Sequence, residues 1–189
     1  MLRAWVKRGI IEKHVLLDGD DVVVPLPAAP EWAIVNAGGH GFYRVGYAPP
    51  LLKKLSGALP RLSPIERFNL VNDSWASVRA RSENSMTSTE YLELVKSFST
   101  EADANVWAVI SGALRTVYGL TSGDHRQAFK QAIRDTVRPV FDKLGWTPKE
   151  GESVHTLQLR GQLAGLLGTV GSDKDIRAEA VVQFDKWKV

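Results

Sequence analysis

The chain has 189 residues and a net charge of +3, and 44% of its residues are hydrophobic and 24% charged. This composition is ordinary for a soluble globular protein and excludes a disordered or fibrous chain. The small surplus of positive charge gives no reason to expect nucleic acid as a partner. The sequence contains no cysteine, which excludes disulfides, thiolate metal sites and a cysteine nucleophile.

Hydrophobic segments give no sign of a membrane protein. No run of about 18 apolar residues is present, which is the length that a spanning helix needs. The first residues lack the long apolar stretch and cleavage site of a signal peptide. We therefore expect no membrane partner and a cytoplasmic location.

Strand-like patterns dominate the first 50 residues. They cover residues 10–17, 22–24, 31–37 and 41–47, separated by turn signals rich in Gly, Asp and Pro. The last segment alternates with a period of two residues, which predicts one buried face. Four strands in so short a stretch predict a small antiparallel sheet that has too little sequence to cover itself.

Helical periodicity replaces this pattern after Pro49 and Pro50. Capping boxes at Ser63 and Thr87 mark two helix starts, and Thr100 is a candidate cap for a third helix. Pro139 is expected to kink or interrupt the fourth helix. The six predicted helices cover approximately residues 63–78, 87–98, 100–117, 124–144, 153–170 and 173–187.

The short loops between these helices imply antiparallel neighbours. The last helix ends at Val189 without a polar capping repeat, which a helical stack normally needs for solubility. We therefore predict a mixed, mainly α fold, in which a small antiparallel sheet is followed by a truncated antiparallel helical repeat. The small sheet at the start and the unfinished helical stack at the end predict that the chain is a fragment of a larger protein.

Known catalytic motifs are missing from the sequence. The histidines are His14, His40, His125 and His155, and none lies three or four residues from another, so no helix offers a two-histidine metal face. The sequence has no H-E-x-x-H, no Walker loop and no G-x-S-x-G. We therefore predict no catalytic, cofactor-binding or metal-binding residue in this chain.

A basic ridge on the fourth predicted helix is the strongest charge pattern. Arg126, Lys130, Arg134 and Arg138 are spaced four residues apart and share one helix side. Such a ridge could receive an acidic partner or a substrate carboxylate. A solvated helix face is the competing interpretation, because Asp135 lies beside the ridge.

Several ordered motifs resemble the aminopeptidase N family of zinc metallo-aminopeptidases. Residues 32–47, WAIVNAGGHGFYRVGY, are similar to the segment N-a-g-g-x-G-F-Y-R-V-x-Y that closes the small β-sandwich domain of that family. Residues 62–75 are similar to the first helix of its C-terminal helical domain, and residues 101–107 resemble its E-x-D-x-x-V-W motif. Later landmarks lie at residues 144–146, 159–160 and 180–187. The resemblance covers nearly the whole chain.

The resemblance implies a fold and a parent activity. Residues 1–50 would be the remnant of the β-sandwich domain, or half a sandwich. Residues 51–189 would be the start of an α-α superhelix of HEAT or armadillo type, incomplete at its C-terminus. Family members remove N-terminal residues from peptides with a zinc ion held by H-E-x-x-H and a distant Glu, while G-A-M-E-N binds the free amine. Those motifs are absent here, so no catalytic residue is carried over.

The matched residues are expected to be structural. Asn36 and the neighbouring glycines suit tight turns, Phe42 and Tyr43 suit packing, and Arg44 would form a pair where sheet and helices meet. The chain would be a non-catalytic part that closes over an upstream catalytic domain and limits peptide access. It would bind no zinc itself and would expose an apolar edge that favours self-association.

A stand-alone helical-repeat module is the alternative function. Such a module would bind a protein or peptide on its concave face without enzymatic activity. Its ligand would be acidic if the basic ridge is used. Capture of an acidic partner that is lost on Arg134→Glu would favour this alternative over the aminopeptidase piece.

Overall fold

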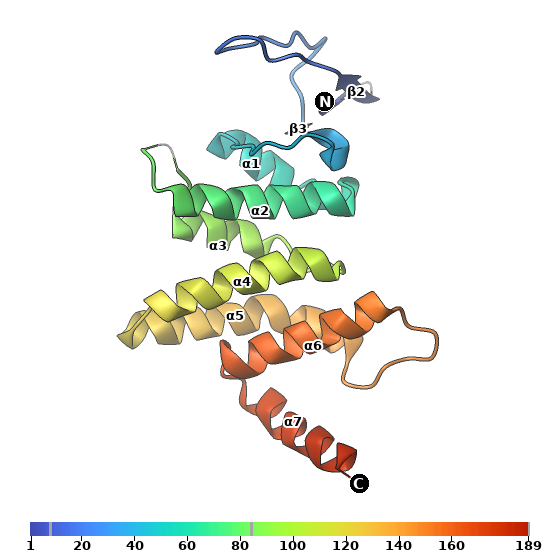
Figure 1. Ribbon diagram of the computed structural model, residues 1–189, viewed down its shortest axis with the longest axis vertical. Coiled ribbons are helices and arrows are strands. Elements are labelled where there is room, and N and C mark those ends of the chain that lie inside the picture. The colour runs from blue at the N-terminus through green and yellow to red at the C-terminus, as the bar shows by residue number, and fades with distance from the viewer. Residues whose placement is uncertain (8, 84, 189) are drawn as a thin grey trace. The chain divides into compact units, whose positions relative to one another are not determined.

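The computed structural model describes residues 1–7, 9–83 and 85–188. The chain forms two compact parts, residues 1–97 and 98–189, and each is described by itself. The described residues are mainly helical with one small antiparallel sheet, which confirms the predicted fold class (Figure 1). Whether the domains divide at residue 50, and whether the helices belong to a superhelix, stay predictions.

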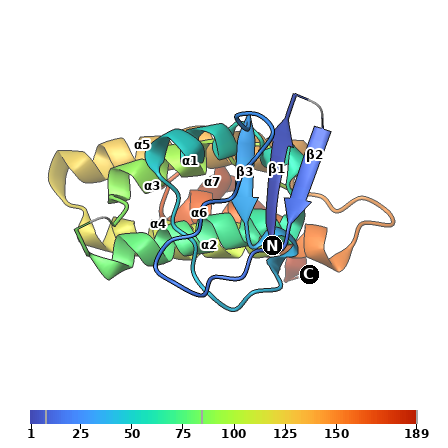
Figure 2. The ribbon, with the colours of Figure 1, turned by 90° about the horizontal axis from the view of Figure 1, so that it is seen from above.

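The sheet of the first part has the order β2-β1-β3, with β1 (Leu2–Val6) in the centre. β2 (Gly9–Lys13) and β3 (Trp32–Val35) pair with it in antiparallel fashion, as Figure 2 shows. Ala4 of the central strand lies opposite Ile11 on one side and Ala33 on the other, and it is fully buried.

Two of the predicted strands are wrong, and β1 was not predicted. Residues 22–24 are not a strand; Pro25 follows them directly, and Pro27 lies two residues further on. Residues 41–47 form a loop instead of a strand, because its backbone groups bond to side chains. Gly41 is bound by the Asn36 amide, and the Val45 N–H donates to Asp73.

Three helices complete the first part. They are α1 (Pro49–Ser56), α2 (Pro64–Ala80) and α3 (Ser88–Lys96), with short 3-10 turns η1 (Ala37–Gly39) and η2 (Leu59–Arg61). α1 packs against β3, and α2 packs against α3 and η1. The predicted capping boxes at Ser63 and Thr87 are confirmed, and α1 is a helix that the sequence prediction missed. The buried side chains between these elements include Leu55, Leu70, Val71, Tyr91 and Leu94.

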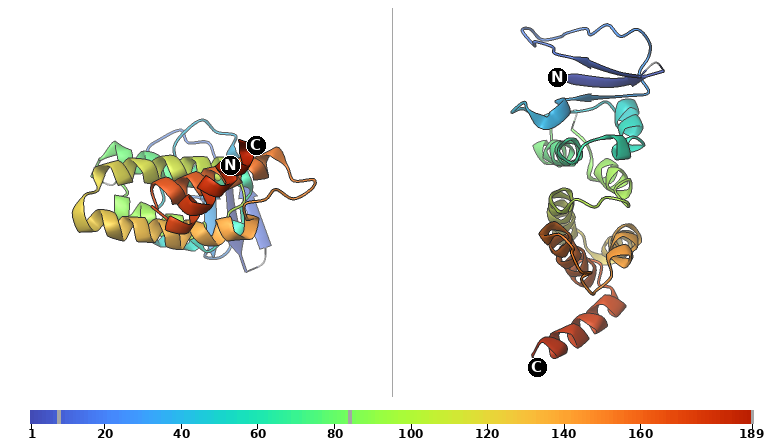
Figure 3. Two further views of the ribbon diagram at one scale, coloured as in Figure 1. Left: turned by 90° about the horizontal axis from the view of Figure 1, so that it is seen from below. Right: turned by 90° about the vertical axis from the view of Figure 1, so that its right-hand side faces the viewer.

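The second part consists of α4 (Ala104–Leu120), α5 (Gly123–Leu144), α6 (Val154–Thr169) and α7 (Lys174–Trp187). α6 packs on both α4 and α5, and their apolar faces bury Trp107, Ile110, Phe141 and Leu163. α7 contacts α6 near its start, where Ile176 is buried, and then runs away from the other helices (Figure 3).

The cap of α4 differs from the prediction, and of the two effects expected of Pro139 only the interruption of α5 is ruled out. Thr100 does not cap α4; the cap is Asp103, whose carboxylate accepts from the N–H groups of Asn105 and Val106. A carboxylate placed there also meets the positive end of the helix dipole favourably. α5 continues past Pro139 to Leu144, so Pro139 does not interrupt it.

Candidate functional site

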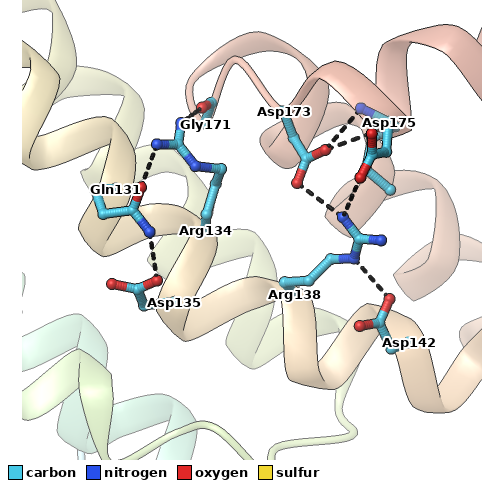
Figure 4. Close-up of polar contacts among 9 residues, drawn as sticks. Gln131, Arg134, Asp135, Arg138, Asp142, Gly171, Asp173 and Asp175 are labelled. Carbon is cyan, nitrogen blue, oxygen red and sulfur yellow. Dashed lines mark hydrogen bonds and ion pairs between the residues drawn. The ribbon is translucent and has the colours of Figure 1, made fainter.

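The four basic residues of the predicted ridge lie along α5, and each is half-buried. Their spacing of four residues places them on one helix side, as the sequence predicts. Arg134 and Arg138 point toward the turn that joins α6 to α7, where their charged groups meet protein acceptors (Figure 4). The ridge is therefore partly an internal structural feature of the second part.

Arg138 connects α5 to the start of α7. Its guanidinium contacts Asp142 at 2.7 Å, Asp173 at 3.0 Å and Asp175 at 3.9 Å (Figure 4). The hydrogen bond to Asp142 and the bond to Asp173 raise the pKa of Arg138, against the opposing effect of burial. Asp173 is buried and also caps α7, because its other carboxylate oxygen accepts from the N–H groups of Asp175 and Ile176.

Arg134 contacts the same turn one helical turn earlier. Its guanidinium donates to the carbonyl of Gly171 and to the side chain of Gln131. Gln131 in turn donates to Asp135 at 2.7 Å. The turn itself leaves no room for a larger residue, because a Cβ on Gly171 would lie 2.8 Å from the carbonyl oxygen of Leu167.

Arg126 and Lys130 complete the ridge. The guanidinium carbon of Arg126 lies 5.0 Å from the ring centre of Tyr118, a cation–π distance. Its Nε atom is buried and has no hydrogen-bond partner among the described residues. Lys130 has no ion pair with any described side chain. These two residues carry the positive charge to which an acidic partner would bind. The existence of such a partner stays a prediction.

Glu66 forms the polar centre of the first part. This carboxylate on α2 is fully buried and accepts from the N–H groups of Ser63 and Gly38 at 2.8 and 2.9 Å. Arg3 of β1 approaches it at 2.6 Å. Burial raises the pKa of Glu66, but these donors and the Arg3 charge outweigh burial and leave the pKa below its ordinary value. One carboxylate thus joins the sheet, the turn η1 and α2.

The motif at residues 36–47 has structural contacts within this part. Asn36 has a left-handed backbone, with φ of 59°, and its side chain bonds both backbone groups of Gly41. Arg44 pairs with Asp73 of α2 at 2.7 Å, which confirms the predicted pair at the junction of sheet and helices. Phe42 and Tyr43, which were expected to pack, are both exposed within this chain.

The motif at residues 101–107 also has a structural explanation. The buried carboxylate of Glu101 accepts from the N–H groups of Ala102 and Asp103, each at 2.9 Å. The indole N–H of the fully buried Trp107 donates to the Glu101 carbonyl at 3.0 Å. The motif therefore builds the start of α4 instead of a reactive site.

A protein metal site needs several ligand side chains close together. Within the ranges that the structure describes, no three His, Asp or Glu side chains gather closely enough to hold a metal ion. The described helices also include none that is long and apolar enough to cross a membrane.

Sequence reasoning missed a cavity of about 950 Å³ in the first part. Its lining comes from the loop before α1, from α1, α2 and α3, and from the segment between α2 and α3. No periodic pattern could reveal such a site, because its walls are contributed by segments with separate patterns. The lining residues include Tyr47, Leu52, Ser77, Met86, Glu90 and Leu94.

Comparison with known proteins identifies the family. The sequence model of the ERAP1-like C-terminal domain matches residues 32–189. Aminopeptidase M1 of Arabidopsis thaliana is 32% identical in an alignment of 178 positions that covers 90% of this chain and 19% of that protein. Tricorn protease-interacting factor F2 of Thermoplasma volcanium is 30% identical over 79% of this chain and 18% of its own length. Puromycin-sensitive aminopeptidase of Caenorhabditis elegans is 25% identical over 79% of this chain and 16% of its own length.

The chain thus spans about a fifth of the length of these relatives. The match agrees with the motifs at residues 36–47 and 101–107, which lie within the matched range. The predicted resemblance to the C-terminal part of an aminopeptidase is confirmed, and the chain belongs to the ERAP1-like C-terminal domain family.

Proposed function

We propose that this chain is the non-catalytic C-terminal part of a zinc-dependent metallo-aminopeptidase that removes N-terminal residues from peptides. The observation that carries this proposal is the family match, which extends from residue 32 to residue 189. Similarity to proteins named aminopeptidase over 90% of the chain supports the same parent activity.

The zinc ion and the catalytic residues belong, in this proposal, to an upstream catalytic domain of the parent. The described residues do not fit a zinc site, since they include no cluster of three or more possible ligands. The residues of this chain therefore have no step of peptide hydrolysis assigned to them. The catalytic domain is the proposed partner of this chain. Peptide substrates would be partners of the chain only as part of the parent enzyme.

The proposed role of the chain is to close over the catalytic domain and shape peptide access. The structural support comes from the ion pairs and hydrogen bonds that join its helices and strands. Arg138 fixes the start of α7 to α5, and Glu66 fixes β1 and η1 to α2. Buried and bridging charges of this kind suit a shaped scaffold, because they favour one arrangement of the elements they join. A cytoplasmic location is part of the proposal.

The test is capture of the native protein with an antibody raised against residues 98–189. The captured protein is incubated with a panel of amino-acid 4-methylcoumaryl-7-amides, which fluoresce when an N-terminal residue is released. We expect hydrolysis of at least one substrate, its loss with 1,10-phenanthroline, and its return on addition of zinc. The matched control is the recombinant 189-residue chain, which should hydrolyse none of the panel.

Each part of the proposal can fail separately. Captured protein that is inactive on the whole panel would contradict the aminopeptidase, and activity that resists the chelator would contradict the zinc. Hydrolysis by the recombinant chain would contradict its non-catalytic role. A stand-alone binding module, the alternative, predicts an inactive captured protein.

A further inference from the structure

The cavity of the first part has the size of a ligand site. Its volume of about 950 Å³ lies within the range of small-molecule and peptide pockets in proteins, roughly 300–1,000 Å³. All of its lining residues lie between Val45 and Leu94, so it is complete within one compact part. The proposed function assigns no role to this cavity.

Hydrogen bonds hold the walls of this cavity in place. On one side, the Val45 N–H donates to the buried carboxylate of Asp73 at 3.2 Å. On the other side, the Met86 N–H donates to the hydroxyl of Ser77 on α2 at 3.0 Å. A cavity with walls fixed in this way is largely pre-formed, which lowers the conformational cost of binding.

Apolar side chains and carboxylates both contribute to the lining, beside several hydroxyl groups. Leu52, Met86 and Leu94 supply an apolar surface from three different segments. Three carboxylates, those of Glu83, Glu90 and Glu93, also line the cavity, against the single ammonium group of Lys53. The lining is therefore apolar and negatively charged.

The charge of Glu90 is secured by the start of α3. One of its carboxylate oxygens accepts from the N–H and the hydroxyl of Thr87, each at 2.8 Å. These bonds lower the pKa of Glu90, so it is ionised at neutral pH. Glu93 pairs with Lys96 at 2.5 Å, so Glu83 and Glu90 are the lining carboxylates that have no ion pair with another described side chain.

We propose that this cavity binds a short peptide segment that carries a lysine or arginine side chain. The aliphatic stem of such a side chain matches the apolar surface of Leu52, Met86 and Leu94, and its charged head matches the carboxylates. This site goes beyond the proposed function and does not depend on it, since binding is measured with the 189-residue chain alone.

The test uses fluorescence anisotropy with a labelled pentapeptide, acetyl-Ala-Leu-Arg-Leu-Lys-amide, at low ionic strength. The matched peptide replaces arginine by citrulline and lysine by acetyl-lysine, which removes both charges and keeps the shape. The protein variant combines Glu83→Gln with Glu90→Gln, which keeps the α3 cap because glutamine also serves in a capping box. The control variant combines Glu31→Gln with Glu150→Gln, two exposed positions outside the cavity.

We expect the uncharged peptide and the cavity variant each to bind roughly tenfold more weakly, and the control variant to bind like the original chain. Thr89→Trp, which fills the cavity from α3, should also weaken binding. Circular dichroism establishes that each variant is folded. If the cavity variant is unfolded, the comparison of the two peptides on the original chain decides.

Several results would overturn the proposal. They are an absence of binding by the original chain, equal affinity for the charged and uncharged peptides, and unchanged affinity in a folded cavity variant or in Thr89→Trp. Displacement of the peptide by spermidine at similar concentration would instead assign the cavity to a polyamine.

Discussion

The guanidinium of Arg138 in α5 lies 3.0 Å from the carboxylate of Asp173, the residue that caps α7. Two helices that are separated by all of α6 are thus joined by the charged contacts of one arginine with Asp173 and Asp175 (Figure 4). Asp173 is buried while Arg138 is partly exposed, so the carboxylate depends on this contact more than the arginine does. The turn between α6 and α7 is ordered by its contact with α5.

Asp173→Ala should destabilise the second part by about 2 kcal/mol, because it removes the cap of α7 together with the partner of Arg138. Arg138→Met should cost about 1 kcal/mol, since the guanidinium is partly exposed and its pairs are screened by solvent. Urea unfolding followed by circular dichroism measures both. Lys130→Ala on the same helix is the control and should have a smaller effect; an equal loss would contradict the role of the contact.

Lowering the pH should destabilise the first part through Glu66. Its pKa in the folded protein lies below the ordinary value of 4.5, so its contribution to stability is present above that value. The contribution is lost as the pH falls through the lower, folded pKa, because protonation then breaks the contacts with Arg3, Gly38 and Ser63.

The free energy of unfolding, measured from about pH 6 to about pH 3, should therefore fall more steeply in the original chain than in Glu66→Gln. The variant should also be less stable by about 3 kcal/mol at neutral pH, because it leaves the buried donors poorly matched. If the free energy of unfolding fell equally with pH in the two proteins, protonation of Glu66 would not be coupled to unfolding, and the prediction would be contradicted.

Gly171→Ala should destabilise the second part by about 1–3 kcal/mol, since the added Cβ would lie 2.8 Å from the backbone oxygen of Leu167. Gly161→Ala in α6 is the matched control, because a Cβ there meets no atom within 4 Å. That change should stabilise the helix by about 0.5–1 kcal/mol. Thermal unfolding of the two variants tests the difference, and equal melting temperatures would contradict the close packing of the turn.

The outer face of α7 should favour self-association. Val181, Phe184 and Trp187 are apolar, and each is more than half exposed. Sedimentation velocity should show a larger average mass as the protein concentration rises, because contact between such faces buries apolar surface. Phe184→Glu should keep the chain monomeric over the same range, whereas the surface change Lys143→Glu should not. A monomeric original chain would disprove this expectation.

Sequence patterns predicted the helices well where capping chemistry is local. Ser63 and Thr87 begin α2 and α3 as expected, because a capping box depends on residues only three positions apart. α1 was missed because the first helix was placed at Ser63, although proline fits the first turn of a helix and Pro49 begins α1. Thr100 was expected to cap α4, but Asp103, three residues later and also a suitable capping residue type, caps it instead.

Tertiary contacts explain the remaining errors. The alternation in residues 41–47 predicted a strand, but Asn36 and Asp73 take the backbone bonds that a strand partner would need. Arg134 and Arg138 lie four residues apart on α5, but the sequence could not show that the α6–α7 turn contacts them. Contacts between residues far apart in the chain leave no periodic pattern.

The size of the native polypeptide tests the central claim most directly. An antibody against this chain is used to blot a lysate of the source organism under denaturing conditions, with the recombinant chain of 20.8 kDa as the marker. We predict a band several times larger than the marker, because the chain spans only about a fifth of its relatives. A single band at 20.8 kDa would contradict the account and would favour a stand-alone helical module.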